Sequence, residues 1–195
     1  MKAKEIMEIV LKSIKREDIL STSAFIEGGT VCTSEQQEVF DDVLSSINDS
    51  IMAISYIYLP QKMKEEIVVS NNQFSYQDLS KTLIDVVRLK DKAGVLHKFC
   101  TYPTYLKSDN GVFEITYTFQ PEIVSSIDDD VEIENKNISS YVIGLGCVAN
   151  FYLKRGAFDE SVIWEHAFKE QINACKRKKY IPQIKVREWW NGKEN

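Results

Sequence analysis

The sequence predicts an α+β protein: an antiparallel helical bundle of about four helices, with an inserted small antiparallel β-sheet and an extended C-terminal arm. Apolar residues recur at helical spacing towards both ends of the chain, whereas between about residues 64 and 122 the apolar period shortens to two. After Pro182 apolar residues again alternate with charged ones. With 195 residues, 44% of them hydrophobic and 27% charged, the chain has the length and composition of one globular domain. We therefore expect a single domain over residues 1–195.

Four helices are expected, over about residues 3–16, 35–57, 139–155 and 159–178. The apolar stripe of the first consists of Ile6, Ile9, Val10 and Ile14. Ser34, followed by Gln37, has the spacing of a capping box at the start of the second helix. The stripe of that helix runs through Val39, Val43, Ile47, Ile51 and Ile54. Pro60 favours an extended segment just before it, so the second helix is expected to end there.

The third helix is predicted to have one thin face, formed by Gly144, Gly146 and Ala149, which lets another helix approach closely. Arg155-Gly156 supplies a stop signal. In the fourth helix we expect Asp159 to act as the N-cap, with Phe158 packing on Ile163 as a hydrophobic staple. The buried stripe of this helix is predicted to be Trp164, Phe168, Ile172 and Cys175.

Strands are expected at residues 67–69, 83–89, 95–99 and 112–119, which form one small antiparallel meander within the β insertion. Glycines in residues 91–94 and 108–111 suit tight hairpin turns. Residues 76–81 are predicted to form a helical or irregular turn. Residues 125–137 read as an exposed polar crossing; their run of three aspartates lacks the glycine and the alternating ligands of a calcium loop.

Cysteine use and charge limit the class of protein. Cys32, Cys100, Cys147 and Cys175 show no C-x-x-C spacing, so we expect a reduced intracellular protein in which Cys147 and Cys175 act as small hydrophobes. No apolar run approaches the roughly 18 to 20 residues that span a bilayer, so no membrane role is predicted. The net charge of −5 is uneven, acidic over residues 122–134 and basic over 176–187, which favours association by patches.

The sequence offers no catalytic, cofactor-binding or metal-binding residues, and we predict that the protein is not an enzyme. Its two histidines are His97, on an expected strand, and His166, on an exposed helical position. Neither has a thiol or carboxylate set at ligand spacing. The sequence contains neither the phosphate-binding nor the dinucleotide-binding glycine motif. The pair Gly144 and Gly146 is expected inside a helix rather than after a strand.

The basic, aromatic tail is the candidate binding segment. Its predicted partner-binding residues are Ile184, Lys185, Val186, Arg187, Trp189 and Trp190. Apolar residues alternate there with charged ones, the pattern of an extended arm able to add to a sheet edge. Three roles stay open: binding a protein partner, gripping nucleic acid with lysines on phosphate and tryptophans on bases, or folding back on its own subunit.

Several segments follow one another in a recognisable order after the stripe-bearing second helix. They are residues 58–60 (YLP), 76–80 (YQDLS) leading to 84–87 (IDVV), 91–94 (DKAG), 102–106 (YPTYL), 113–117 (FEITY) and a helical pair from 140–143 (SYVI) to Glu170. Over roughly residues 34–190 this order resembles the head-to-tail adaptor (connector, neck) proteins of tailed bacteriophages.

The resemblance implies a structural virion protein that forms a ring of about a dozen copies below the portal, with DNA passing through its lumen without specific recognition. The C-terminal arm would bind the portal protein, and the sheet would meet a tail or stopper protein. Acidic side chains would suit such a lumen. The implied location is the virion neck, with the host cytoplasm before assembly. The alternative function is a nucleic-acid-binding accessory protein that uses the same basic, aromatic tail.

Overall fold

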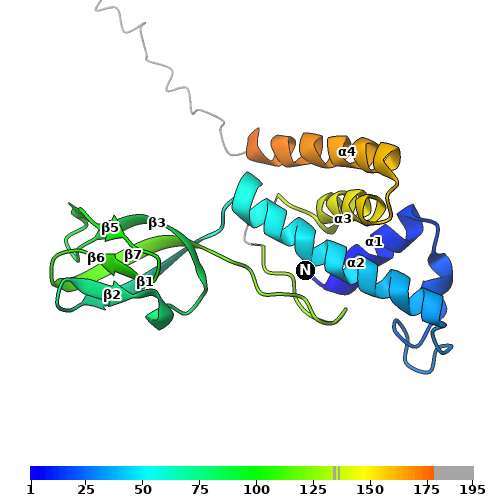
Figure 1. The fold of residues 1–195 in the computed structure, drawn as a ribbon, viewed down its shortest axis with the longest axis horizontal. Coiled ribbons are helices and arrows are strands. Elements are labelled where there is room, and N and C mark those ends of the chain that lie inside the picture. Colours follow the sequence, from blue (N-terminus) through cyan, green and yellow to red (C-terminus); the bar gives the residue numbers. More distant parts are fainter. Residues whose placement is uncertain (134, 136, 178–195) are drawn as a thin grey trace, which may run out of the picture.

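The hydrophobic residues separate into two clusters in the computed structural model, which describes residues 1–133, 135 and 137–177. One cluster lies among four α-helices and the other between two small antiparallel sheets (Figure 1). We call residues 1–59 and 124–177 the helical lobe and residues 62–119 the β lobe. The predicted α+β class and the insertion of the β elements between helices are therefore confirmed.

Helix α1 (Ala3–Ser13) ends three residues earlier than predicted. Ile14 caps it, and Lys15 adopts a left-handed φ of 59°, which breaks the helical path. Ile6 and Val10 are buried as expected, and a short 3₁₀ helix, η1 (Glu17–Ser21), follows.

Helix α2 (Ser34–Ala53) continues into a π-helical turn, η2 (Ile54–Tyr58). The capping box is present, but it lies one residue earlier than predicted: the Gln36 backbone N–H donates to Thr33 Oγ1 at 3.2 Å, and the Thr33 N–H donates to Gln36 Oε1 at 3.0 Å. Ser34, the predicted cap, already has helical backbone. All five residues of the predicted stripe are buried.

Helix α3 (Ser140–Lys154) packs against α1, α2 and α4. A Cβ atom on Gly144 would lie 3.0 Å from Ile9 of α1, and one on Gly146 would lie 3.1 Å from both Phe168 of α4 and Ser50 Oγ of α2. The two glycines therefore admit different neighbours, so the prediction that they thin a single face was wrong.

Helix α4 (Phe158–Arg177) begins after Gly156, whose φ of 75° ends the α3 turn as predicted. Phe168, Ile172 and Cys175 are buried and Trp164 is half-buried, which confirms the stripe. The staple is absent, because Phe158 is 64% exposed and Ile163 is 68% exposed. Phe158 is itself helical, and positions five apart do not share a helix face. Asp159 accordingly lies in the first turn rather than at the cap.

The β lobe contains two sheets instead of the predicted single meander. The larger has the order β1-β7-β3-β4 and the smaller the order β2-β6-β5. Their bounds are β1 (Lys62–Val69), β2 (Gln73–Ser75), β3 (Leu83–Lys90), β4 (Leu96–His97), β5 (Cys100–Thr101), β6 (Tyr105–Lys107) and β7 (Gly111–Phe119). The last strand in the sequence is central because β7 pairs with both β1 and β3.

The expected exposed crossing at residues 125–137 is only partly exposed. Ile127 and Val131 are buried in the helical core, together with Val124 just before them. The crossing also accepts hydrogen bonds from the start of α1: the Ala3 N–H donates to the Asp129 carbonyl at 3.0 Å, and the Lys4 N–H to that of Ile127 at 2.9 Å. These carbonyls satisfy N–H groups that have no partner inside the helix, so the segment closes the core.

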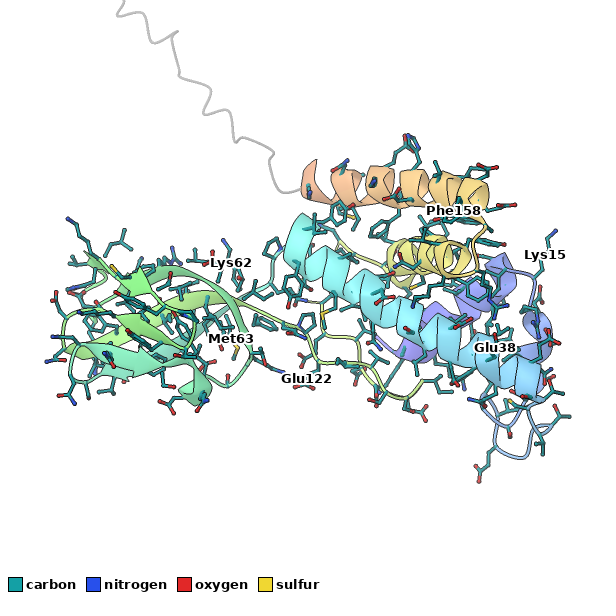
Figure 2. The ribbon with its side chains drawn as sticks, viewed as in Figure 1. Lys15, Glu38, Lys62, Met63, Glu122 and Phe158 are labelled. Atoms are coloured by element: carbon teal, nitrogen blue, oxygen red, sulfur yellow. The ribbon has the colours of Figure 1, made fainter. Side chains whose placement is uncertain are left out.

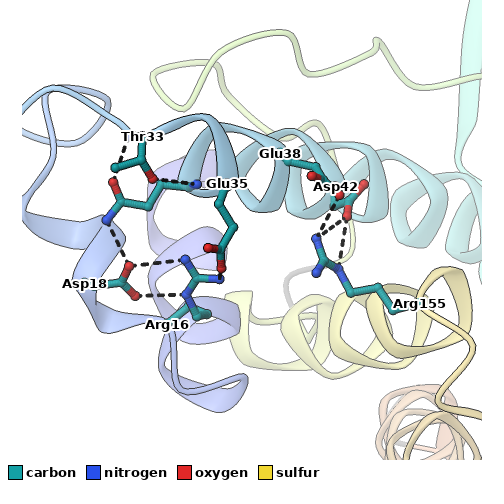
Figure 3. A network of polar contacts seen from close by, with 8 residues as sticks. Arg16, Asp18, Thr33, Glu35, Glu38, Asp42 and Arg155 are labelled. Atoms are coloured by element: carbon teal, nitrogen blue, oxygen red, sulfur yellow. Dashed lines mark hydrogen bonds and ion pairs between the residues drawn. The ribbon is translucent and has the colours of Figure 1, made fainter.

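A polar network fixes α2 to its neighbours (Figure 3). Arg16 Nε lies 3.0 Å from Asp18, Arg16 Nη1 lies 3.1 Å from Glu35, and Arg155 Nη2 lies 2.8 Å from Asp42. The hydrogen bond from Arg16 is the main cause of a lowered pKa for Asp18. The acidic face of α2 is therefore engaged with cations of its own chain.

Candidate interaction site

The predicted partner-binding residues, Ile184 to Arg187 with Trp189 and Trp190, lie outside the described residues, but the point from which that segment departs is well defined. At the end of α4, Cys175 Sγ lies 3.1 Å from the Asn137 carbonyl oxygen. Lys176 Nζ lies 5.1 Å from the centroid of the Tyr58 ring. The C-terminal end of α4 is thereby held beside η2, on the side of the helical lobe that faces the β lobe (Figure 1).

The junction between the lobes is built from polar side chains. Lys81 Nζ lies 2.6 Å from Glu122 and 3.0 Å from Glu132, and these hydrogen bonds, the one from Glu122 first, raise the pKa of Lys81. Buried Gln61 donates from Nε2 to the Glu132 carbonyl at 2.8 Å. Figure 2 shows Glu122 beside the connecting segments, close to Lys62 and Met63. The β lobe is thus tied to the crossing segment of the helical lobe.

A groove of about 640 Å³ lies in the β lobe. The first half of β3 and the turn between β5 and β6 both line it. Its lining comprises residues 76–77, 79–86 and 101–104. The short helix η3 (Tyr76–Asp78) and the loop that follows it complete the lining.

The β3 wall of the groove is a free sheet edge. β3 pairs with β7 from Leu83 to Lys90, with register shifts between Leu83 and Asp85 and between Val86 and Arg88. In contrast, β4 pairs only with Leu89 and Lys90. After His97 the chain leaves this edge to form β5 of the smaller sheet. On the side away from β7, residues 83–88 therefore have no partner strand within the described residues, and their outward backbone groups are open to water or to an added strand.

The side chains around this edge include tyrosine rings and one carboxylate, which gives the edge a small negative charge. The Tyr76 hydroxyl is buried beside the Tyr102 backbone, yet it has no hydrogen bond of good geometry to any described residue, and burial raises its pKa. Tyr102 is 42% exposed and stacks on Tyr105 with ring centroids 4.6 Å apart. The Asp85 carboxylate lies near Tyr76 and forms no ion pair in the described part of the chain.

The groove is held in shape by a carboxylate behind it. Glu65 of β1 accepts hydrogen bonds from the hydroxyl of Tyr117, on β7, and from both the N–H and the hydroxyl of Ser80. Burial by itself raises the pKa of Glu65, but these hydrogen bonds outweigh it, so the pKa of Glu65 is lowered. The loop between η3 and β3 is fixed to the larger sheet in this way.

No known family model matches this chain, and no curated protein matches it at a significant level. The resemblance to phage neck proteins therefore stays a proposal. Within residues 1–133, 135 and 137–177, no helix has the length and apolar character needed to cross a bilayer. The same residues contain no group of three or more His, Cys, Asp or Glu side chains placed to hold a metal ion.

The two histidines lie where the sequence placed them. His97 is on β4, with Nε2 3.2 Å from Asp91 Oδ2 and its ring against Phe113, and His166 is exposed on α4. For the residues that line the groove, in contrast, the sequence predicted only a turn and a strand, and it did not predict a binding site. The edge depends on where β4 stops pairing with β3, and no residue pattern marks that point.

The four free cysteines should react in a fixed order with a thiol reagent. Cys100 is exposed, whereas Cys147 is fully buried, which raises its pKa to about 12. Because the thiolate is the reactive form, we expect iodoacetamide at about pH 8 to label Cys100 first and Cys147 only after unfolding. Peptide mass spectrometry over time measures the order, with Cys100→Ser as the control. Labelling of Cys147 at the rate of Cys100 in the folded protein would contradict the packing of α3.

Proposed function

We propose that this chain is a structural protein of a tailed-phage virion, a head-to-tail adaptor without catalytic activity. The observation that carries the proposal is that the chain forms two lobes, each with its own hydrophobic core and its own exposed apolar surface. The two lobes are joined at a polar junction. An adaptor must hold two different partners at once, and two lobes with distinct surfaces suit that task.

The helical lobe supplies the first surface. Phe158 and Val162 lie one turn apart on α4, and both are mostly exposed, as is Ile163 beside them. Helix α4 is the outermost helix, packed on α3, and Phe158 projects from its N-terminal end (Figures 1 and 2). This apolar surface supports self-association into the proposed ring of about a dozen copies around a DNA-filled lumen. In this proposal the four helices form the antiparallel bundle of the neck proteins.

The β lobe supplies the second surface. Val87, Leu96 and Tyr102 are exposed around the free edge of β3, and we assign this region to a tail or stopper protein. Residues 181–195 are the proposed C-terminal arm that binds the portal, with Trp189 and Trp190 as its aromatic anchors. The protein would be made in the host cytoplasm and would remain in the neck of the virion.

Removing residues 181–195 should leave a folded protein that no longer joins portal complexes. The reason is that aromatic anchors buried in a partner carry most of an interface's affinity, typically about 2 kcal/mol or more each. Co-sedimentation with purified portal rings measures the association. A matched control removes only residues 191–195, which keeps both tryptophans and should bind normally. If the chain without residues 181–195 still co-sedimented, the arm would have no part in portal binding.

A further inference from the structure

We propose that the groove beside β3 is a docking site for an added β-strand, and that its occupant is the chain's own C-terminal segment, residues 184–190, folded back within the same copy. The inference stands on the described geometry of the groove and on the sequence of the tail. It does not depend on the neck assignment.

The proposed docking site consists of an edge of β3 that has no partner strand among the described residues, together with the groove beside it. Residues 83–88 expose backbone donors and acceptors on the side away from β7. The β5–β6 turn, including Tyr102 and Pro103, lines the same groove of about 640 Å³ as residues 83–86 of that edge. A groove of this kind accepts extended backbone, because main-chain hydrogen bonds supply affinity while the wall receives alternate side chains.

Tyr76 lines the groove, and its buried hydroxyl lies beside the Tyr102 backbone. Burying a hydroxyl without a partner is unfavourable, so native proteins nearly always provide one. No described residue makes a hydrogen bond of good geometry to it.

The tail segment matches this site in pattern and in charge. Over residues 184–187 an extended chain presents Ile184 and Val186 on one face and Lys185 and Arg187 on the other. Glu188 then falls on the first face and Trp189 on the second, so the segment carries two basic side chains against one acidic side chain. The charged side chains that line the groove are Lys81 and Asp85. Lys81 is neutralised by Glu122 and Glu132, which leaves the Asp85 carboxylate without an ion pair among the described residues. The residual charge of the groove is therefore negative.

The connection favours the same copy over a neighbour. Helix α4 ends at Arg177, on the side of the helical lobe facing the β lobe, and six residues precede Ile184. Extended, the seven steps from Arg177 to Ile184 span up to about 25 Å. Where such a linker spans the distance to the groove, the tethered segment has an effective concentration of about the millimolar range, far above that of a neighbouring copy in dilute solution.

Residue-resolved amide hydrogen exchange by NMR tests the proposal directly. We expect the outward-facing amides of residues 83–88 to exchange about tenfold or more slowly in the full chain than in a chain ending at Tyr180. Amides of the β1–β7 ladder serve as the internal control, because they should be equally protected in both chains if the fold is intact.

Proline variants distinguish backbone pairing of the tail with β3 from simple shielding of the β3 amides by the tail. Neighbouring N–H groups of a strand point in opposite directions, so one of Lys185→Pro and Val186→Pro must remove a ladder hydrogen bond and release the residue 83–88 amides. Gly192→Pro, beyond the proposed strand, should leave them protected.

Equal exchange of these amides with and without the tail would overturn the proposal. Protection that increases with protein concentration between about 10 and 200 µM would overturn the intramolecular form, since it would place a neighbour's segment in the groove. Portal binding does not enter these measurements. Failure of the adaptor assignment and failure of strand docking are therefore seen in different experiments. If both proposals hold, the groove and the portal compete for one segment, and a tail or stopper protein reaches the β3 edge only after that segment has left it.

Discussion

Replacing Gly146 with leucine should destabilise the protein by about 3 kcal/mol, because the new side chain has no space between α3 and its neighbours. Even a Cβ atom would lie 3.1 Å from Phe168 and 3.1 Å from Ser50 Oγ. These contacts come from α4 and α2, on either side of the glycine, so relief of one clash leaves the other. Chemical denaturation followed by circular dichroism measures the loss in the free energy of unfolding.

Two further variants define the cause of that loss. Tyr141→Leu introduces the same side chain at an exposed position of the same helix and should change stability by less than about 0.5 kcal/mol. Phe168→Ala is itself destabilising, but it removes one of the two obstructing side chains. The double variant of Gly146→Leu and Phe168→Ala should therefore be clearly more stable than the sum of the single effects predicts. Strict additivity would mean that the two side chains do not meet.

Replacing Leu106 with alanine should destabilise the β lobe by about 2 to 5 kcal/mol, the range for a fully buried leucine that leaves a cavity. Leu106 has no exposed surface, and it belongs to the same cluster as Phe74, Leu89 and Ile115. Its strand, β6, is the central strand of the smaller sheet. The substitution removes apolar contact that joins the two sheets, and it also loosens the wall of the groove.

Leu96→Ala is the matched control for this prediction. Leu96 is 65% exposed on β4, so the same truncation should change stability by less than about 0.5 kcal/mol. Denaturant titrations of both variants give the comparison, and amide exchange identifies the lobe that is affected. Equal effects of Leu96→Ala and Leu106→Ala would show that the smaller sheet does not share a core with the larger one.

The elements that the sequence predicted well are those with long, uninterrupted periodicity. The stripe of α2 from Val39 to Ile54 and the glycine stop at Gly156 depend on residues close in the chain, so a single sequence contains the information. The burial of Cys147 and Cys175 follows from the same pattern. Errors of one to three residues at the C-terminal end of α1 and in the capping box reflect local choices between similar neighbours, such as Thr33 and Ser34.

The misplaced features depend on which distant segments meet. The sequence could not show that β7 pairs with both β1 and β3, that β4 stops after two residues, or that carbonyls near Ile127 complete the start of α1. The predicted staple between Phe158 and Ile163 is absent because α4 already begins at Phe158, which places the two side chains on different faces of the helix. Each of these outcomes is set by long-range packing rather than by local propensity.

The amino-acid sequence by itself determined the α+β class, the four helices and the insertion of the strands between them, whereas the C-terminal arm stays a prediction outside the described residues. These depend on hydrophobic period and turn chemistry, which are local properties of a chain. Only the tertiary structure decided that the strands form two sheets, that Gly144 and Gly146 face different helices, and that residues 83–88 of β3 have no second partner strand within the described part of the chain. Those features exist only once segments far apart in the sequence are packed together, because strand pairing and close helix contact are fixed by the lowest-energy arrangement of the whole chain.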